Sequence, residues 1–196
     1  MPPQPDPESD PALEECLAEA FRRLSRGVAD RRSAFHTPTL ATIGADGAPQ
    51  ARTVVLRGFD VASRRLRMHT DGRSAKAAEL ARDARCALHL YDPGAKLQLR
   101  LSGRATLHAE DAVAEQGWAD SRDFSRMCYA IEPAPGTPIA APPPAPRDAL
   151  AGRAAFRVIL LRFERLEWLE LAAGGHRRAC FTWADDTAPA MTWLVP

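Results

Sequence analysis

The sequence predicts an α+β fold, in which an antiparallel, barrel-like sheet carries a few helices at its periphery. Three observations support this prediction. An amphipathic helical pattern follows a proline-rich start, short alternating segments typical of strands fill the first half, and further strand-like segments close the chain. Because helices and strands do not alternate regularly along the chain, an α+β class is expected rather than a parallel α/β class.

The first helix is predicted over residues 11–32, and Pro38 bars its continuation. Apolar residues recur there at steps of three and four, so the helix is expected to pack on the sheet through one stripe. The stripe contains Leu13, Cys16, Leu17, Ala20, Phe21, Leu24 and Val28. Residues 1–11 hold five prolines and three acids, which predicts a disordered tail before a single domain over 12–196.

Strands in the first half are predicted from β-branched and alternating residues. They cover 39–44, 51–57, 65–70, 86–91 and 97–107, with a turn at Asp46-Gly47 and a connection over 59–64. Ser74 is placed to cap a helix over 75–82, and 110–120 also has a helical pattern.

The second half begins with an irregular segment. Residues 132–147 hold seven prolines, which excludes regular structure and predicts a proline-rich loop over 132–151. The chain then returns to strands, which are predicted at 156–163, 166–171, 178–183 and 191–195.

Composition excludes several classes of function. The chain has 26 Lys and Arg against 25 Asp and Glu, so it lacks the basic excess of a general nucleic-acid binder. No apolar run approaches the roughly 18 residues of a membrane helix, and the start has no signal-peptide pattern, which predicts a cytoplasmic protein. The cysteines form no CxxC pair and the histidines no metal motif, so buried free thiols, no disulfide and no metal are expected. These cysteines are Cys16, Cys86, Cys128 and Cys180.

Two segments combine basic and hydroxyl side chains near strand ends and a helix start, RTVVLRG at 52–58 and HTDGRSAK at 69–76. Residues 52–76 hold seven Lys or Arg against two acids, and Lys76 is one of only two lysines in the chain. A helix start with Ser, Arg and Lys nearby suits a phosphate dianion. Solvated strand-tip charges and a routine helix cap explain the same residues from spacing alone, and no Rossmann or P-loop motif is present.

Longer stretches of the sequence resemble a known family. They are LATIGADGAPQARTVVLRGF at 40–59, MHTDGRSAKAAEL at 68–80, LQLRLSGRATL at 97–107, WADSRDFSRMCY at 118–129 and FRVILLRFERLEWLEL at 156–171. The chain resembles the pyridoxamine 5′-phosphate oxidase-like FMN-binding split-barrel family, in wording closest to a bacterial oxidase-related subgroup. The resemblance implies a split barrel, a homodimer with FMN at the subunit interface, and a small anionic substrate.

The resemblance also implies roles for individual residues. Arg52 and Lys76 would hold the FMN phosphate, helped by the hydroxyls of Thr70 and Ser74 and by Arg73. The flavin ring would be contacted by the backbone of Thr53, Val54, Val55 and Leu56, by Gln98 and by His69. The substrate would meet Arg57, Trp118, Arg122, Ser125 and Arg126. Strict alternation puts Arg52 and Arg57 on opposite strand faces, so one site can use both only if the strand bends or one of them serves the partner. No catalytic acid or base is predicted.

Two departures from the family pattern leave the activity open. The step Ser74-Ala75-Lys76 lacks one arginine of the family pattern, and residues 175–180 lack its Arg-Leu-His-Asp-Arg motif. We therefore expect an FMN-dependent oxidoreductase resembling pyridoxamine/pyridoxine 5′-phosphate oxidase with its substrate undefined. The alternatives are an NAD(P)H-dependent flavin reductase and a non-catalytic flavin- or tetrapyrrole-binding protein on the same fold.

Overall fold

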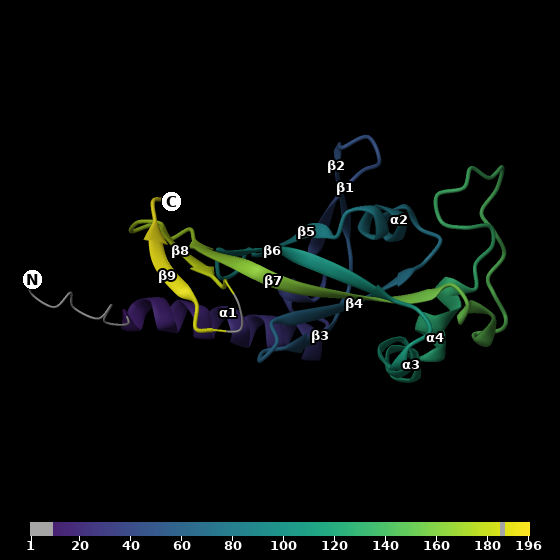
Figure 1. The fold of residues 1–196 in the computed structure, drawn as a ribbon, viewed down its shortest axis with the longest axis horizontal. Coiled ribbons are helices and arrows are strands. Elements are labelled where there is room, and N and C mark those ends of the chain that lie inside the picture. Colours follow the sequence, from purple (N-terminus) through teal and green to yellow (C-terminus); the bar gives the residue numbers. More distant parts are fainter. Residues whose placement is uncertain (1–9, 185–186) are drawn as a thin grey trace, which may run out of the picture.

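A computed structural model describes residues 10–184 and 187–196 as one antiparallel sheet with helices at its margins (Figure 1). The strands are β1 Thr39–Ile43, β2 Pro49–Thr53, β3 Leu56–Asp60, β4 Arg65–Asp71, β5 Arg85–Asp92, β6 Leu97–His108, β7 Phe156–Glu170, β8 Arg177–Thr182 and β9 Ala190–Leu194. The helices are α1 Pro11–Ala29, α2 Ala75–Arg82, α3 Ala112–Ala119 and α4 Asp123–Arg126, and the 3₁₀ turns are η1 Ala34–His36, η2 Met127–Tyr129 and η3 Leu150–Gly152. The predicted α+β class is confirmed.

The sheet runs in the order β2-β1-β5-β6-β7-β4-β3, and β8 and β9 continue from β7. All of these pairs are antiparallel. Within the described residues β2 and β3 stand at opposite ends of this order and do not pair, so the barrel is split rather than closed. In Figure 1 the β1–β2 hairpin and the segment after α4 rise on the same side of the sheet.

Strand β7 is the central strand of the sheet, because it pairs with β4, β6 and β8 along its 15 residues. Its register against β6 shifts at one point, where Ser102 faces Arg165 but Gly103 faces Phe163. Glu164 is therefore an extra residue in the ladder, and its carbonyl accepts a hydrogen bond from Trp183 N at 2.9 Å. Such a bulge bends the strand and increases its twist, as a barrel requires.

Helix α1 begins at a residue pair that favours a helix N-terminus. The Asp10 carboxylate accepts a hydrogen bond from Ala12 N, and Pro11 occupies the first helical position. The buried stripe of the helix packs against β3, β7, β8 and β9, as its periodicity predicts (Figure 1). Leu24 joins Phe163 and Phe181 in one hydrophobic core with side chains that are fully buried.

Two of the strand predictions are wrong. Residues 51–57 form the end of β2 and the start of β3 rather than one strand, and β3 extends into the predicted connection as far as Asp60. The break falls at Val54, whose N–H donates to Pro38 O at 2.9 Å instead of to a strand ladder. The predicted strands 156–163 and 166–171 are one strand, because the bulge at Glu164 is absorbed without interrupting β7.

Other predictions fall on the chain ends and the proline-rich segment. The predicted tail falls largely on residues 1–9, which lie outside the described residues, whereas Asp10 and Pro11 belong to the start of α1. Residues 132–149 contain no helix or strand, and η3 begins at Leu150.

The cysteines differ from prediction at one position. Cys16, Cys86 and Cys180 are buried free thiols, but Cys128 is exposed, because η2 lies at the surface beside a cavity. Among the described helices, none has the length and apolar character needed to cross a membrane.

The close packing at the β6–β7 bulge predicts how a substitution at Gly103 changes the stability of the protein. A Cβ atom there would lie 2.1 Å from the Arg162 carbonyl oxygen, so Gly103→Ala is expected to lower the free energy of unfolding by about 1–3 kcal/mol. Gly174→Ala is the control, because a Cβ there meets nothing within 4 Å. Urea titrations of both variants measure the difference. Equal stabilities would mean that the β6–β7 bulge is not closely packed.

Candidate functional site

The break between β2 and β3 forms one wall of a cavity of about 290 Å³, named here the Lys76 cavity. Residues far apart in the sequence meet around it. They are Thr53, Val54, Val55, Arg57, His69, Lys76, Phe124, Ser125, Cys128 and Tyr129. Seven of these were predicted from the sequence as cofactor or substrate contacts, so the break gathers a large part of the predicted site in one place.

Lys76 belongs to a group of hydroxyl and basic side chains that is named here the cradle. The cradle consists of Arg52, Thr70, Ser74 and Lys76. The Lys76 ammonium donates to Thr70 Oγ1 at 3.3 Å, and Thr70 Oγ1 lies 3.2 Å from Ser74 Oγ. Ser74 occupies the predicted N-cap position of α2, but its hydroxyl donates to Asp71 O at 2.6 Å and makes no capping bond. The hydroxyls therefore pack inside the cradle, where Thr70 and Ser74 are almost fully buried.

Two cations lie close together in the cradle. Burial lowers the pKa of Lys76, and the nearby Arg52 guanidinium lowers that pKa further, against the opposing pull of Asp71 and Glu79. Arg52 is partly neutralised by an ion pair with Glu79 at 2.7 Å, and it also donates to Thr42 Oγ1. Within the described residues Lys76 forms no ion pair, so a half-buried positive charge stays uncompensated.

Arg52 in the cradle and Arg57 in the wall of the Lys76 cavity lie in the same region because the chain bends between them. Between them Val54 and Val55 leave the ladder, and the register of β3 shifts between Leu56 and Gly58. Arg52 therefore lies beside Lys76 while Arg57 lines the cavity that Lys76 enters. This is the bend that the spacing of the two arginines requires.

His69 forms part of the cavity wall as a neutral imidazole. Burial lowers its pKa to about 4, with further lowering by Arg67 and Arg57. Its ring packs edge-on against Phe156 with the centroids 4.9 Å apart, and its Nε2 atom is buried without a hydrogen-bond partner. Ser121 Oγ donates to Gly117 O at 2.8 Å and lies 3.4 Å from Nδ1, which favours the Nδ1–H tautomer.

A second cavity of about 200 Å³, named here the Arg67 cavity, adjoins the first and shares Arg57, His69 and Ser125 with it. Its other walls come from the end of α1, from η1, and from the segment between α3 and α4. They include Val28, Ala29, Arg31, His36, Leu56, Arg67, Asp120, Ser121 and Arg122. Four arginines against one aspartate make this cavity electropositive.

Arg73, predicted as a phosphate contact, is fully engaged by protein groups. Its guanidinium donates to both carboxylate oxygens of Asp71, at 3.0 and 2.7 Å, and it pairs with Glu132. It also donates to the carbonyls of Tyr129 and Ile131 at 3.2 and 2.9 Å. These contacts tie the loop before α2 to the start of the proline-rich segment, and so hold the Tyr129 wall of the Lys76 cavity in place.

Three other predicted residues belong neither to the cradle nor to the walls of either cavity. Gln98 lies on β6 and its Oε1 is 3.0 Å from His89 Nε2. Trp118 is buried with Phe156 and Val158, so the segment after α3 faces the cavity through its later residues instead. Arg126 lies over the Trp118 ring, 4.9 Å from its centroid, and donates to its carbonyl.

Residues that the sequence did not single out complete the walls. Phe124 is 87% exposed at the mouth of the Lys76 cavity, and Tyr129 packs on Phe156 with the centroids 5.1 Å apart. Burial raises the pKa of Tyr129 to about 12, so its hydroxyl stays protonated. The available signal was an aromatic residue within the predicted Arg122–Arg126 segment, Phe124, and another just after it, Tyr129.

Known proteins are similar to the part of the chain that contains the cradle. Residues 15–109 match the profile of the pyridoxamine 5′-phosphate oxidase FMN-binding domain, a stretch that contains the whole cradle. Over this stretch, a little under half of its length, the chain is similar to the pyridoxamine 5′-phosphate oxidase-like family. FMN is the cofactor of the matched domain.

Curated members of this family match part of the chain. Pyridoxine/pyridoxamine 5′-phosphate oxidase 2 of Arabidopsis thaliana is 35% identical over 106 residues, which are 50% of this chain and 53% of that protein. The pyridoxine/pyridoxamine 5′-phosphate oxidase of Cupriavidus pinatubonensis is 34% identical over 95 residues, 48% of this chain and 44% of that protein. The chain thus spans about half the length of the curated relatives it matches.

Solved structures of the pyridoxamine 5′-phosphate oxidase-like fold match more of the chain. A pyridoxamine 5′-phosphate oxidase-related, FMN-binding protein of Nostoc punctiforme has a TM-score of 0.76 at 27% identity, covering 91% of this chain and 96% of that one. PhzG of Burkholderia lata, in complex with tetrahydrophenazine-1-carboxylic acid, has a TM-score of 0.67 at 21% identity, covering 100% and 97%. The second likeness shows the fold alone.

The donors of the cradle fit the phosphate of the family cofactor. A phosphate dianion would neutralise the uncompensated charge on Lys76 and relieve its repulsion with Arg52, in a place where three of the four side chains already converge through hydrogen bonds. The valines of the β2–β3 break and Tyr129 offer apolar surface beside it for a planar ring.

The lowered pKa of the buried His69 imidazole predicts how the stability of the protein depends on pH. Its folded-state pKa of about 4 lies below the ordinary value of 6.5, so between these pH values the unfolded chain binds a proton that the folded chain does not. Stability is therefore expected to fall as the pH drops through this window, by about 3 kcal/mol at pH 4 from His69 alone. Urea titrations of wild type and His69→Phe at pH 7 and pH 4 measure this term as the difference between the two proteins. Identical pH dependence in both proteins would contradict the assignment.

Proposed function

We propose that the chain is an FMN-dependent oxidoreductase that acts on a small anionic substrate as a homodimer. The observation that carries the proposal is the junction of the two cavities. The Lys76 cavity meets the cradle, the Arg67 cavity is electropositive, and Arg57, His69 and Ser125 belong to both. A cofactor with a phosphate and a substrate with a negative charge would each have a separate basic site, with one shared wall between them.

When bound, FMN would supply the redox chemistry, which is hydride and electron transfer. The protein supplies binding and orientation. Arg52 and Lys76 bind the phosphate, and the hydroxyls of Thr70 and Ser74 complete its surroundings. The Thr53–Leu56 backbone would face the flavin ring, and the neutral His69 keeps one wall free of a further positive charge.

The substrate is proposed to bind in the Arg67 cavity. Arg57 and Arg122 offer guanidinium groups there, and Ser125 offers a hydroxyl. Arg67 is held in place by hydrogen bonds to Asp120 at 3.3 Å and to Arg57 O at 3.3 Å. Guanidinium groups bind phosphate and carboxylate in two-point geometry, so either anion fits this cavity.

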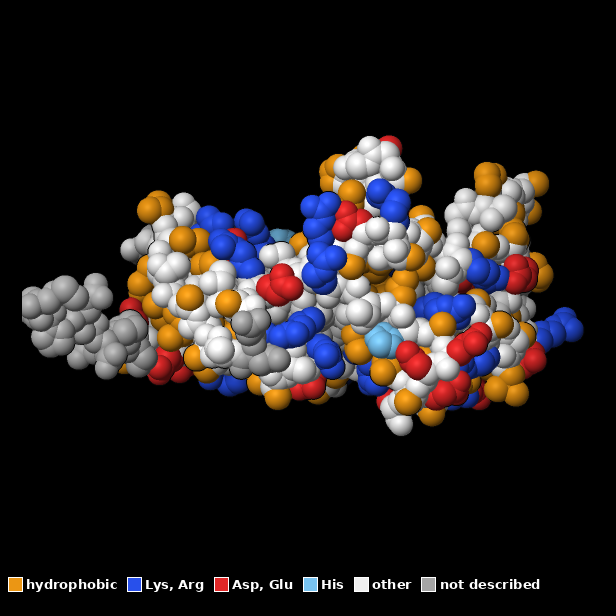
Figure 2. Space-filling view, viewed as in Figure 1, with side chains coloured by type: hydrophobic (Ala, Val, Ile, Leu, Met, Phe, Trp, Pro, Cys, Tyr) orange, Lys and Arg blue, Asp and Glu red, His pale blue; other side chains and the backbone are white. Residues whose placement is uncertain are grey.

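The proposed homodimer accounts for Gln98. This residue lies on β6, away from the cavities of its own chain, beside His89 and the exposed Arg100. Figure 2 shows Lys and Arg side chains gathered over the middle of the sheet, between the C-terminal strands and the β1–β2 hairpin. We infer that a second copy covers part of the sheet and that Gln98 reaches the flavin of that copy.

One observation favours a second candidate, a flavin-binding protein with another reaction or none. In β8, Arg178 pairs with Glu167 at 2.5 Å, and Arg177 pairs with Glu170 at 2.8 Å. The arginines of this C-terminal strand are thus engaged within the sheet, where the family's Arg-Leu-His-Asp-Arg motif is missing.

The cradle predicts an effect on FMN affinity. Lys76→Met removes the uncompensated cation and is expected to raise the Kd for FMN by about 10- to 100-fold, as for the loss of one charge-assisted hydrogen bond. Lys96→Met is the matched control, because Lys96 is the other lysine and lies in the turn between β5 and β6. Flavin fluorescence quenching measures both. An unchanged Kd in Lys76→Met would move the phosphate elsewhere.

The same assay tests the dimer. Gln98→Ala is expected to weaken FMN binding although Gln98 is outside the Lys76 cavity of its own chain. Mixing Lys76→Met chains with Gln98→Ala chains should restore one tight site per mixed dimer, because one interface then combines an intact cradle with an intact Gln98. Mixtures that bind no better than the two separate variants would contradict the shared site.

The activity is tested with FMN-loaded protein under anaerobic conditions. Pyridoxamine 5′-phosphate, used as the anionic probe, is expected to bleach the flavin absorbance. Arg57→Gln should raise the concentration that gives half-maximal bleaching by at least about tenfold. Bleaching by NADPH alone would instead favour a flavin reductase, and no bleaching by either compound would favour a non-catalytic flavoprotein.

A further inference from the structure

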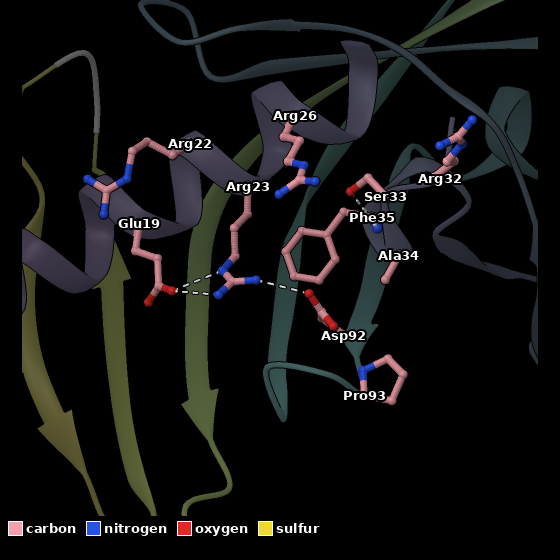
Figure 3. Close-up of a pocket in the computed structure, with 10 residues that line it drawn as sticks. All are labelled: Glu19, Arg22, Arg23, Arg26, Arg32, Ser33, Ala34, Phe35, Asp92 and Pro93. Carbon is pink, nitrogen blue, oxygen red and sulfur yellow. Dashed lines mark hydrogen bonds and ion pairs between the residues drawn. The ribbon is translucent and has the colours of Figure 1, made fainter. Parts of the chain in front are cut away.

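A separate basic hollow of about 480 Å³ lies between α1, η1 and the turn after β5 (Figure 3). This α1 hollow shares no lining residue with the Lys76 cavity or the Arg67 cavity. Four arginines and two acids line it, together with Ser33 and Phe35. None of these residues has a part in the proposed oxidoreductase site.

Both acids of the α1 hollow are already satisfied. Glu19 accepts from Arg23 Nε at 2.9 Å through one oxygen and from Trp168 Nε1 at 3.1 Å through the other. Asp92 accepts from Arg23 Nη1 at 3.0 Å through one oxygen and from the backbone N–H groups of residues 94 and 95 through the other. The acids thus hold Arg23 at the floor of the hollow, and each of their oxygens already accepts at least one hydrogen bond.

The other three arginines are weakly compensated. Arg22 pairs with Glu15 at 2.7 Å, but both side chains are mostly exposed, and Arg26 pairs with Asp30 at 3.4 Å. The Arg32 guanidinium is exposed and, among residues 10–184 and 187–196, has no hydrogen bond or ion pair. Exposed ion pairs contribute little free energy, so these guanidinium groups are available to a ligand.

The arrangement of these cations defines the ligand. Figure 3 shows Arg22 and Arg32 toward opposite ends of the hollow, with Arg26 between them. Arg22 and Arg26 are one helical turn apart, where like charges repel unless an anion lies between them. The Ser33 hydroxyl accepts from Phe35 N at 3.2 Å, which leaves its hydrogen to donate to an anion.

We propose that the α1 hollow binds a small molecule carrying a diphosphate group, at a site separate from the flavin and substrate cavities. The cations are spread along the hollow, so two linked phosphates can contact Arg26 and an arginine at one end at the same time, each phosphate with its own guanidinium group. Guanidinium groups bind phosphate oxygens in pairs and match this geometry.

The test uses full-length protein saturated with FMN and inorganic pyrophosphate as the probe, with binding followed by isothermal titration calorimetry at low ionic strength. Saturable binding at one site in the α1 hollow is expected, and this binding should persist in Arg57→Gln, which weakens the Arg67 cavity. The triple variant Arg22→Gln, Arg26→Gln, Arg32→Gln should weaken this binding by at least about tenfold. Arg32→Glu alone should weaken it too, and this exposed side chain has no contact whose loss would disturb folding.

The matched control is the triple variant Arg65→Gln, Arg104→Gln, Arg147→Gln, which removes the same charge from exposed positions outside every cavity described above. Its pyrophosphate affinity should equal that of the wild type. The proposal is overturned if wild type shows no saturable binding, or if both triple variants lose affinity equally, as general charge attraction would require. It is also overturned if binding survives the α1 triple variant and is lost in Arg57→Gln, which would place the anion in the Arg67 cavity.

Discussion

Two positive charges held close together in a half-buried place are the constraint on which this site depends. Lys76 lies in the first turn of α2 and Arg52 lies near the end of β2, and the fold brings them side by side although each disfavours the other's charge. Glu79, one turn further along α2, forms an ion pair with Arg52 but not with Lys76. The folded chain therefore retains an electrostatic cost that a phosphate dianion removes, and binding of such an anion is coupled to the stability of the β2, β4 and α2 region.

The break at Val54 and Val55 decides what else surrounds this pair. Because β2 pairs with β1 and β3 pairs with β4, the chain must cross between the two ends of the sheet order at these two residues. That crossing places Arg57 and a stretch of backbone outside the strand ladders in the wall of the cavity. Arg73 then fixes the opposite wall by binding Asp71, Glu132 and two carbonyls, so a residue that resembles a phosphate contact in sequence acts as an anchor in the fold.

Local patterns in the sequence were sufficient for the elements whose stability is local. Helix α2 has the predicted bounds because its start, its apolar spacing and its end are all encoded within ten residues. The β2–β3 break was not predicted, because it depends on a hydrogen bond to Pro38 and on pairing with strands distant in sequence. The same holds for Tyr129 and Cys128, which reach the cavity only because the segment after α3 folds back beside β3 and α2. Neither the substrate nor the partner chain is encoded in a local pattern. For this reason the sequence alone left several reactions open.

The affinity of the purified chain for FMN relative to riboflavin tests the central claim most directly, because the two ligands share the ring and differ in the phosphate. If the cradle binds the phosphate, FMN should bind at least about 100-fold more tightly than riboflavin at low ionic strength, in keeping with two charge-assisted contacts. The preference should shrink as salt is added. Equal affinities for FMN and riboflavin would contradict the account, since Arg52 and Lys76 would then have no phosphate to hold.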